Sequence, residues 1–286
     1  MTYRDLRYLR VDVEDLEAAS AFAADVFALM PMDRDDNRAL FRSDARNYAL
    51  CCARGDGNAV ALTVARPEDL DALADRLAAA GHPSARLSAE ACAVRQVKQG
   101  LSVAAPNGVT VELVWRPLTS GWPYHGGRDA GISDFAAVSL CCRDIAASEE
   151  FWVRGLGLRV SDYAGDAVFL ALDEAHHRIA LYPSERDGIL GASWEVATRD
   201  HIMRNWYHFQ KLQLPVVAGP GRQPTSGASF VTTRGPGGLL FSYIHGMEKG
   251  PQIATRGPRQ FADAARSHCA WGSPSTQPEF QGRTEG

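Results

Sequence analysis

The sequence lacks several features that would restrict where the protein resides. No stretch approaches the roughly 18 consecutive apolar residues of a membrane-spanning helix, so we expect no transmembrane segment. The N-terminal segment MTYRDLRYLRVDVED carries charges throughout and has no apolar core, which argues against a secretory signal peptide. No C-x-x-C motif is present, and the adjacent pairs among the six cysteines are poor disulfide partners. Together these absences predict a cytoplasmic protein with reduced thiols.

A strong excess of one charge sign is missing as well. The chain has 30 Lys and Arg against 34 Asp and Glu, for a formal net charge of −4. So weak an acidity predicts no affinity for nucleic acid or for an anionic membrane. Its 286 residues, 45% of them hydrophobic, are enough for two domains that each bury a core.

An internal repeat is the most informative feature that is present. The segment RVDVEDLEAASAFAADVFAL, from Arg10, aligns with SLCCRDIAASEEFWVRGLGL, from Ser139, at a shift of 129 residues. PNGVTVELVW, from Pro106, aligns with PGGLLFSYIH, from Pro236, at a shift of 130 residues. The first pair reads as a strand, a capping Asp and a helix, and the second as a turn and a strand. Two nearly equal shifts predict a duplicated domain.

Each copy divides again into two βαβββ units, which predicts an α+β fold. The expected helices cover residues 67–80 in the first copy, and 145–154 and 199–212 in the second. The expected strands of the first copy cover residues 38–42, 47–53, 60–64, 93–97, 100–105 and 109–115. Those of the second copy cover residues 134–142, 159–164, 167–173, 176–182, 192–197, 228–234 and 238–244.

Composition divides the chain into four parts. We expect an N-terminal domain at residues 1–117, a Gly- and Pro-rich linker at 118–131, a C-terminal domain at 132–246 and an extended tail at 247–286. The tail loses periodicity but contains Phe261, Trp271 and Phe280. It is expected to be either disordered or a strap packed on the body or on a partner subunit.

The four tandem units resemble the vicinal-oxygen-chelate superfamily, which includes glyoxalases, bleomycin-resistance proteins and type I extradiol dioxygenases. Two segments resemble the extradiol branch in particular: DEAHHRIALYP, from Asp173, is similar to its double-histidine strand, and AGPGRQPTSGASFVTTRGPGG, from Ala218, to its G-R-H loop. The resemblance implies two tandem domains with curved, barrel-like mixed sheets. It also implies a homo-oligomer that acts on a small aromatic compound.

In that family the C-terminal domain holds ferrous iron with two His and one Glu. The resemblance places these ligands at Ala137, at Ser193 (or Ala192 after a slip of one residue) and at Ser242. The N-terminal domain has Tyr8 and Glu112 at equivalent positions. Because Ala has no donor atom and neutral Ser hydroxyls are poor iron ligands, we expect no metal and no cofactor in the vacated pocket.

Strand alternation predicts which side chains line that pocket. The candidate catalytic residues are His177, which matches the family's acid/base histidine, and Glu195, which is expected either to orient His177 or to act as a base. The other expected lining residues are Ala137, Ser139, Cys141, His176, Ser193, Tyr207, His208, Gln223 and Ser242. Trp194 and Phe230 are expected to point away. The alternative is that His177 is a relic with a satisfied hydrogen bond and that Glu195 is a surface or ion-paired residue.

Several functions remain open at this point. The first is an enzyme without the family iron site that acts on a small aromatic or ring-fission compound by acid/base chemistry of the isomerase, lyase or hydrolase type. The second is a non-catalytic binding protein of the resistance type, and the third is a partner subunit of an active homologue. An extradiol ring-cleaving dioxygenase with an unusual metal site is a further alternative.

Overall fold

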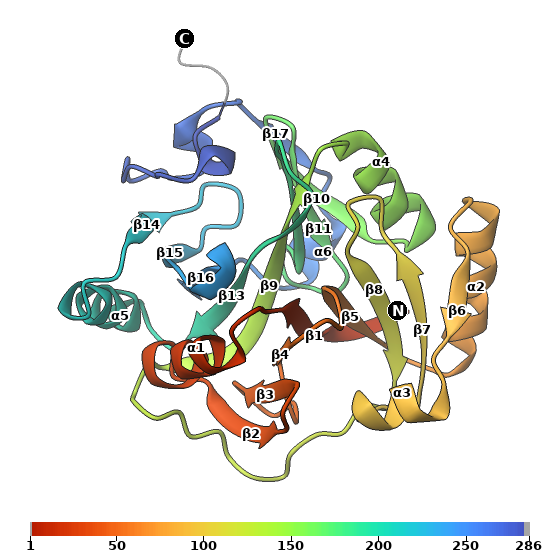
Figure 1. The fold of residues 1–286 in the computed structure, drawn as a ribbon. Coiled ribbons are helices and arrows are strands. Elements are labelled where there is room, and N and C mark those ends of the chain that lie inside the picture. The colour runs from red at the N-terminus through yellow and green to blue at the C-terminus, as the bar shows by residue number, and fades with distance from the viewer. Residues whose placement is uncertain (1, 283–286) are drawn as a thin grey trace.

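The computed structural model describes residues 2–282 and contains the four expected βαβββ units (Figure 1). The first unit consists of β1 (Tyr3–Asp12), α1 (Leu16–Ala21), β2 (Met30–Arg34), β3 (Arg38–Arg42) and β4 (Leu50–Ala53). The second consists of β5 (Ala59–Val64), α2 (Glu68–Ala79), β6 (Ser84–Arg86), α3 (Ala89–Val94), β7 (Gln99–Ala104) and β8 (Thr110–Trp115).

The next two units repeat this plan. The third consists of β9 (Ile132–Cys142), α4 (Ile145–Glu150), β10 (Arg159–Ala164), β11 (Ala167–Ala171) and β12 (Ile179–Pro183). The fourth consists of β13 (Gly188–Val196), α5 (Arg199–Lys211), β14 (Val216–Arg222), β15 (Ser229–Arg234) and β16 (Leu240–His245). The tail adds α6 (Pro251–Thr255), β17 (Arg259–Phe261) and 3₁₀ turns at Ala265–Ser267 and Pro278–Phe280.

The helix starts show why the repeat folds twice in the same way. Asp15 accepts a hydrogen bond from the Ala18 amide at 2.9 Å, and Asp144 accepts one from the Ala147 amide at 2.9 Å. Each carboxylate thus caps the first turn of its helix. Both helices then continue as a π-helical turn, at Phe22–Val26 and Phe151–Gly155. The prediction of a duplicated α+β fold is confirmed down to these details.

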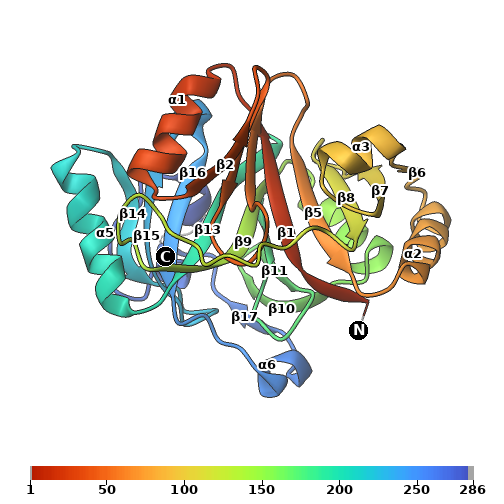
Figure 2. The ribbon, with the colours of Figure 1, turned by 90° about the horizontal axis from the view of Figure 1, so that it is seen from below.

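The strands form two curved mixed sheets. The first has the order β2-β3-β4-β1-β5-β8-β7-β6, and the second β14-β15-β16-β13-β9-β12-β11-β10-β17. In every unit the first and last strands pair in parallel, and the first strands of paired units run antiparallel. α1 and α5 lie at one end of the molecule and α2 and α3 at the other (Figure 2).

Several elements differ from those expected from sequence. Residues 93–97 do not form a strand, because Ser88 caps the helix α3 by accepting from the Ala91 amide at 3.1 Å. The strand β14 was not expected, since its Gly-Pro-Gly sequence is typical of a turn, but β14 is an edge strand, where proline is tolerated. β12 begins only at Ile179, so the paired histidines before it lie in a loop.

Aromatic side chains join the two sheets in one hydrophobic core. Phe27 stacks face to face on Tyr243, with ring centroids 4.0 Å apart, and meets the edge of Trp194 at 4.9 Å. The Tyr243 hydroxyl donates to the Phe27 carbonyl at 2.7 Å, and Arg128 of the connecting segment donates to that hydroxyl at 2.8 Å. Trp194 and Tyr243 therefore face the helical segment of the first unit, and Tyr243 also contacts Phe209 of α5, so the opposite face of β13 and β16 is free to line a cavity.

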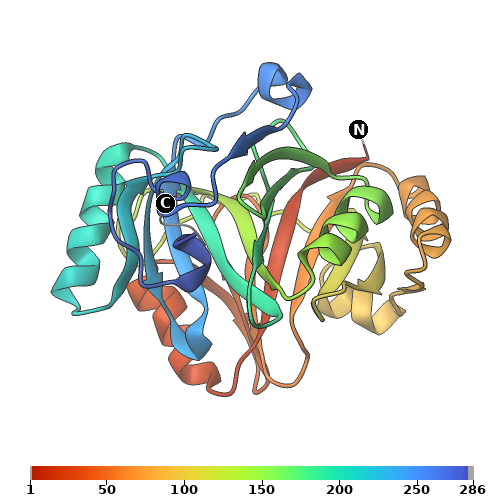
Figure 3. The same ribbon diagram turned by 90° about the horizontal axis from the view of Figure 1, so that it is seen from above.

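The tail is a strap on the second sheet and not a free extension within the described residues. β17 pairs with β10 at one edge of that sheet, and Ser275 bridges to Ala218 of β14 at the other edge. The strap therefore spans the mouth of the curved sheet, as seen from above in Figure 3. No helix of the part that the structure describes is long and apolar enough to cross a membrane.

A buried carboxylate anchors this strap. Asp162 of β10 is fully buried and accepts hydrogen bonds from Arg256 at 2.7 Å and from Arg259 at 2.7 Å. Its Oδ2 also lies 2.7 Å from Nε2 of His176. Burial by itself would raise the pKa of Asp162, but the hydrogen bonds from His176, Arg259 and Arg256 outweigh it and hold the pKa well below the usual range.

We expect Phe27→Ala to lower the free energy of unfolding by about 3–5 kcal/mol, because truncating a fully buried Phe leaves a cavity at the contact between the sheets. Urea denaturation followed by tryptophan fluorescence measures this loss. Trp122→Ala is the control, since Trp122 is 81% exposed and its loss should change stability by no more than about 0.5 kcal/mol. Equal effects of the two variants would contradict the packing described here.

We expect Asp162→Asn to cost about 1.5–3 kcal/mol at neutral pH, because it removes charge-assisted hydrogen bonds to two partly exposed guanidinium groups. A carboxyl with a lowered pKa stabilises the fold above its unfolded pKa of about 3.9 and loses that contribution as the pH falls further. The difference between wild type and variant should therefore shrink below about pH 4. Urea denaturation at several pH values tests this, with the exposed Asp33→Asn as control. A pH-independent difference would contradict it.

Candidate functional site

The residues at the expected metal positions lie in one row across the second sheet. Ala137 of β9 pairs with Ser193 of β13, and Ser193 pairs with Ser242 of β16. Cross-strand partners share a face of the sheet, so the three side chains point the same way. Ala192 pairs with Phe241 in the hydrophobic core, which assigns the middle position to Ser193.

The first sheet has the same row, but it is filled. Tyr8 pairs with Ala61, and Ala61 pairs with Glu112. Glu112 is fully buried, accepts from the Tyr8 hydroxyl and lies 2.7 Å from Arg95 and 3.3 Å from Arg10. Arg95 reaches this row because it follows α3, the helix that replaces an expected strand. Ion pairs thus occupy the interior that the second sheet leaves open.

The second sheet encloses a cavity of about 710 Å³ between its concave face and the strap. This volume lies within the range of about 300–1,000 Å³ for small-molecule sites. The sheet and its loops contribute Ser139, His177, Tyr182, Ser193, Ala218, Gln223, Ala228, Phe230, Thr232, Ser242, Ile244 and Met247. The strap contributes Ala265, Arg266, His268, Cys269, Ala270, Gly272, Ser273, Pro274, Ser275, Phe280, Gln281 and Gly282.

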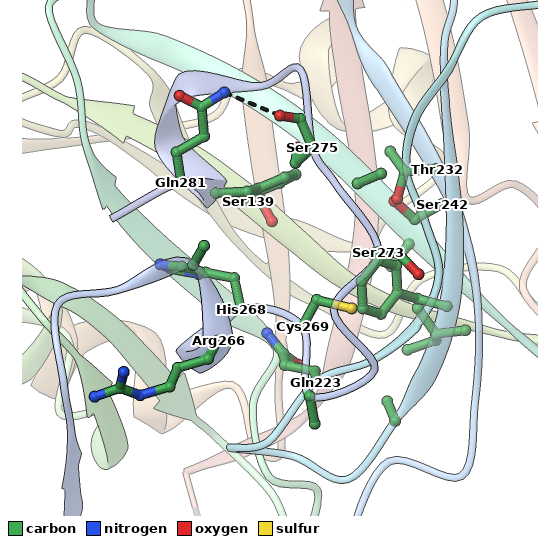
Figure 4. A pocket seen from close by; sticks show the side chains of 18 of the residues that line it. Ser139, Gln223, Thr232, Ser242, Arg266, His268, Cys269, Ser273, Ser275 and Gln281 are labelled. Atoms are coloured by element: carbon green, nitrogen blue, oxygen red, sulfur yellow. Dashed lines mark hydrogen bonds between the residues drawn. The ribbon is translucent and has the colours of Figure 1, made fainter. Parts of the chain in front are cut away.

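Figure 4 shows how these two walls face each other. Ser242 and Thr232 lie together on the sheet side, with their hydroxyl oxygens 2.8 Å apart. On the strap side, Gln281 donates to the Ser275 carbonyl at 2.9 Å, and Arg266 extends away from the other labelled side chains. The cavity interior is therefore lined mostly by neutral polar and aromatic groups.

Five of the expected site residues lie on the wall of this cavity: Ser139, His177, Ser193, Gln223 and Ser242. Two others lie just behind it. Ala137 packs in the apolar cluster that includes Ile244 and Met247, both of which line the cavity. His176 is fully buried behind His177. The alternation of side chains along the strands therefore brings Ser139, Ser193 and Ser242 to the same face, as the cavity requires.

Four other expected residues lie elsewhere. Tyr207 is 61% exposed, and His208 lies on the same helix, α5, which packs on the far face of the sheet through the Phe209–Tyr243 ring contact. Glu195 accepts from the Gly246 amide at 2.8 Å and lies 3.8 Å from Nδ1 of His245, so it ties the end of β13 to the end of β16.

Cys141 is the fourth residue outside the lining, because the strap covers it. Its thiol contacts the Glu279 carboxylate at 3.4 Å, and burial raises its pKa to about 12. A thiol held protonated in this way is a poor nucleophile. The same carboxylate accepts from the Ser184 hydroxyl at 2.7 Å, which fixes the end of the strap to the sheet.

Phe230 lines the cavity, although strand alternation was expected to turn it away. The register explains the difference, because Phe230 of β15 pairs with Ile244 of β16 and so shares its face. The strap adds Phe280, which meets Tyr182 edge to face at 5.2 Å. The cavity therefore has the aromatic walls that the sequence analysis did not assign to it.

A chain of hydrogen bonds holds His177 on the cavity wall. Its Nδ1 lies 2.9 Å from Nδ1 of His176, whose Nε2 contacts Asp162 at 2.7 Å. A carboxylate only accepts, so Nε2 of His176 carries a proton. In the tautomer in which Nδ1 of His176 accepts from Nδ1 of His177, Nε2 of His177 is unprotonated.

The environment of His177 keeps it in the neutral form. Burial lowers the pKa of His177 well below its ordinary value, and the neighbouring Arg178 guanidinium acts in the same direction. None of the hydrogen bonds among residues 2–282 uses its Nε2 atom. The arrangement supplies a neutral imidazole with a free lone pair, which is the form that accepts a proton.

The row of Ala137, Ser193 and Ser242 does not fit the metal of the resembling family. It offers no imidazole and no carboxylate, and the Ser242 hydroxyl is already hydrogen-bonded to Thr232. Within the described range, 2–282, no group of three or more His, Cys, Asp or Glu side chains is placed to hold a metal ion. No step is therefore assigned to a metal.

Comparisons with known proteins agree with this architecture. Residues 134–243 match the Glyoxalase/Bleomycin resistance protein/Dioxygenase superfamily. The biphenyl-2,3-diol 1,2-dioxygenase of Paraburkholderia xenovorans (strain LB400) is 26% identical over 202 residues, which cover 63% of this chain and 67% of that enzyme. The 1,2-dihydroxynaphthalene dioxygenase of Sphingobium xenophagum is 24% identical over 269 residues, covering 86% and 90%.

Solved structures extend the likeness to nearly the whole chain. The halotolerant catechol dioxygenase BphC superposes with a TM-score of 0.88 at 19% identity and covers 98% of this chain and 97% of its own. The Mn(II)-bound glyoxalase from Novosphingobium aromaticivorans superposes with a TM-score of 0.85 at 24% identity, covering 99% and 95%. Residues 134–243 therefore match the model of the glyoxalase/bleomycin resistance protein/dioxygenase superfamily, and the chain as a whole shares the fold of these solved structures.

Proposed function

We propose that the cavity of the second sheet binds a small aromatic or ring-fission compound and transforms it by proton transfer through His177. The observation that carries this proposal is the chain Asp162–His176–His177, which ends in a neutral imidazole on the cavity wall. The relatives that cleave biphenyl-2,3-diol and 1,2-dihydroxynaphthalene support an aromatic ligand. The 710 Å³ cavity is large enough for compounds of that size.

The proposed step needs only groups of this chain. Nε2 of His177 accepts a proton from an acidic O–H or C–H of the ligand, and Nδ1–H keeps its hydrogen bond to His176. The imidazolium returns the proton to another ligand atom, so the protein is regenerated without an oxidant or reductant. This sequence of events serves an isomerase or lyase reaction directly. It serves a hydrolase when the first proton comes from water.

Aromatic walls favour a second candidate function, which is ligand binding without turnover. Tyr182, Phe230 and Phe280 surround the cavity and can stack on a planar compound. A resistance-type binding protein needs such walls and no proton-transfer group. Only the catalytic function depends on His177, so a substitution of His177 distinguishes the two functions.

We expect His177→Gln to reduce turnover by about 100-fold or more while the dissociation constant for the ligand changes much less, because the variant removes the base and keeps the volume. The assay measures binding by calorimetry, and product formation by chromatography. Suitable ligands are 2,3-dihydroxybiphenyl, 1,2-dihydroxynaphthalene and their ring-fission products.

The exposed His125→Gln is the matched control and should behave as wild type. Unchanged turnover in the His177→Gln variant would contradict the proposed proton-transfer role of His177. Tight binding with no conversion of any compound would favour the binding function instead.

The missing ligand set gives a second test. We expect purified wild-type protein to hold no stoichiometric iron or manganese, and the variant Ala137→His/Ser193→His/Ser242→Glu to acquire Fe²⁺, since it places two imidazoles and one carboxylate in one row. Metal content measured by plasma mass spectrometry after reconstitution decides this. The same variant with Ser242→Gln is the control without a carboxylate. Stoichiometric metal in the wild type would contradict the proposal.

A further inference from the structure

A proton-transfer site usually uses a second polar group to bind or polarise the ligand. Glu195, the residue expected to act with His177, is not part of the cavity wall. Among the described residues that line the cavity, the ionisable side chains are those of His177, Tyr182, Arg266, His268 and Cys269. Besides His177, the candidates for contact with the same ligand are therefore Tyr182, Arg266, His268 and Cys269.

Three of these four residues are poorly suited. Burial raises the pKa of Tyr182 above its ordinary value, and its ring is packed against Phe280. Arg266 is exposed and extends away from the cavity (Figure 4). The Cys269 sulfur lies directly over Gly221, where an added Cβ would be only 2.6 Å from it, so the thiol is wedged against the backbone of β14.

His268 has the properties that the others lack. It follows the 3₁₀ turn at Ala265–Ser267, where its amide donates to the Ala265 carbonyl at 3.0 Å. Its ring lies 6.0 Å from that of Tyr182 and 6.3 Å from that of Phe280. The residue is only 8% exposed, and its buried Nδ1 atom has no hydrogen-bond partner among residues 2–282. A buried polar atom left unpaired in this way costs free energy unless another group satisfies it.

A continuous series of rings connects His268 to His177. The His177 ring meets the edge of Phe169 at 5.1 Å, Phe169 meets Tyr182 at 6.1 Å, and Tyr182 meets His268 at 6.0 Å. Both imidazoles line the cavity, one from the loop before β12 and one from the strap. Of the two rings between them, Tyr182 lines the cavity as an aromatic wall and Phe169 is buried. Two hydrogen-bonding groups joined by a flat apolar surface match a ring system with polar substituents at separate positions.

We propose that His268 is the second imidazole that contacts the ligand, and that the strap is thereby part of the binding site for a hydroxylated aromatic compound. This inference rests on the proposed function of the cavity. His177 contacts one polar substituent and His268 hydrogen-bonds to another, while the ring lies against the aromatic wall. Burial lowers the pKa of His268, so the ring is neutral and offers one donor and one acceptor to a phenolic hydroxyl.

The anchors of the strap keep His268 in position. Arg256 and Arg259 bind Asp162 on one side of it, and Glu279 binds Ser184 on the other. Residue 268 lies between these two attachments in the chain. Its imidazole is thus fixed relative to His177, because both depend on Asp162: one through the strap and one through His176.

Nuclear magnetic resonance of the histidine rings tests this without an activity assay. The full chain is labelled with ¹⁵N-histidine and titrated with 2,2',3-trihydroxybiphenyl, which carries hydroxyls on both of its rings, and the variants His177→Gln and His268→Gln assign the two ring signals among the eight histidines. We expect the ligand to shift both signals. The ring signal of the exposed His125 is the internal control and should not move.

Each outcome decides something different. A shift of both signals supports the inference, and a shift of His268 alone supports it while removing His177 from the site. A shift of His177 alone overturns the role of His268 and leaves the proposed function standing. If neither signal moves, the aromatic ligand class of the proposed function fails together with this inference.

Affinity provides a second measurement. We expect His268→Leu to weaken binding of 2,2',3-trihydroxybiphenyl by about 5- to 10-fold, the loss of about one hydrogen bond, and His268→Gln to restore part of it. Thermal unfolding checks that both variants fold. Equal affinity of wild type and the leucine variant, with an unchanged melting temperature, would overturn the inference. So would a leucine variant that binds more tightly.

Discussion

The structure of the candidate site depends on one buried carboxylate, that of Asp162. It attracts two guanidinium groups from the strap and one imidazole from the loop before β12. The Asp162 carboxylate would be strongly destabilising at this depth without partners, so the strap and the histidine loop must both be in place around it. The cavity wall and the orientation of His177 therefore form together, and the strap cannot leave without disturbing the imidazole chain.

The duplicated fold shows two ways of using the same row of residues. In the first sheet, Glu112 and its arginine partners fill the row, and α3 supplies one of those partners. In the second sheet, small side chains leave the row open, and the strap covers what α3 does not. The backbone plan is the same in both, so the difference in chemistry comes from side-chain size and from which segment closes the mouth of the sheet.

Much of this architecture could be predicted from the sequence, because the repeat, the capping aspartates and the strand alternation are local signals. The same alternation brought Ser193 and Ser242 together, whereas His177 reaches the cavity from a loop that alternation does not describe. It failed where the answer depended on register between strands, as for Phe230, or on the face of the sheet that a helix covers, as for Tyr207. Those are properties of the packed sheet and leave no mark in a single strand.

The strap was the largest part that sequence could not place. Its lack of periodicity allowed disorder as well as packing, and only its scattered aromatics indicated anchors. The residues that fix it are two arginines whose partner lies more than ninety positions earlier in the chain. A contact between such distant charged residues has no periodic signature, so His268 could not be recognised as part of the wall.

The position of the strap in the chain also affects how the protein is made. Residues 247–282 leave the ribosome after both sheets, so the sheets can assemble while the cavity still lacks one wall. During this interval the concave face of the second sheet is open to water, and Asp162 lacks the two arginines that later surround it. Completion of the cavity thus comes after the synthesis of both halves of the fold, and a product that ends before residue 247 would lack the wall that closes the site.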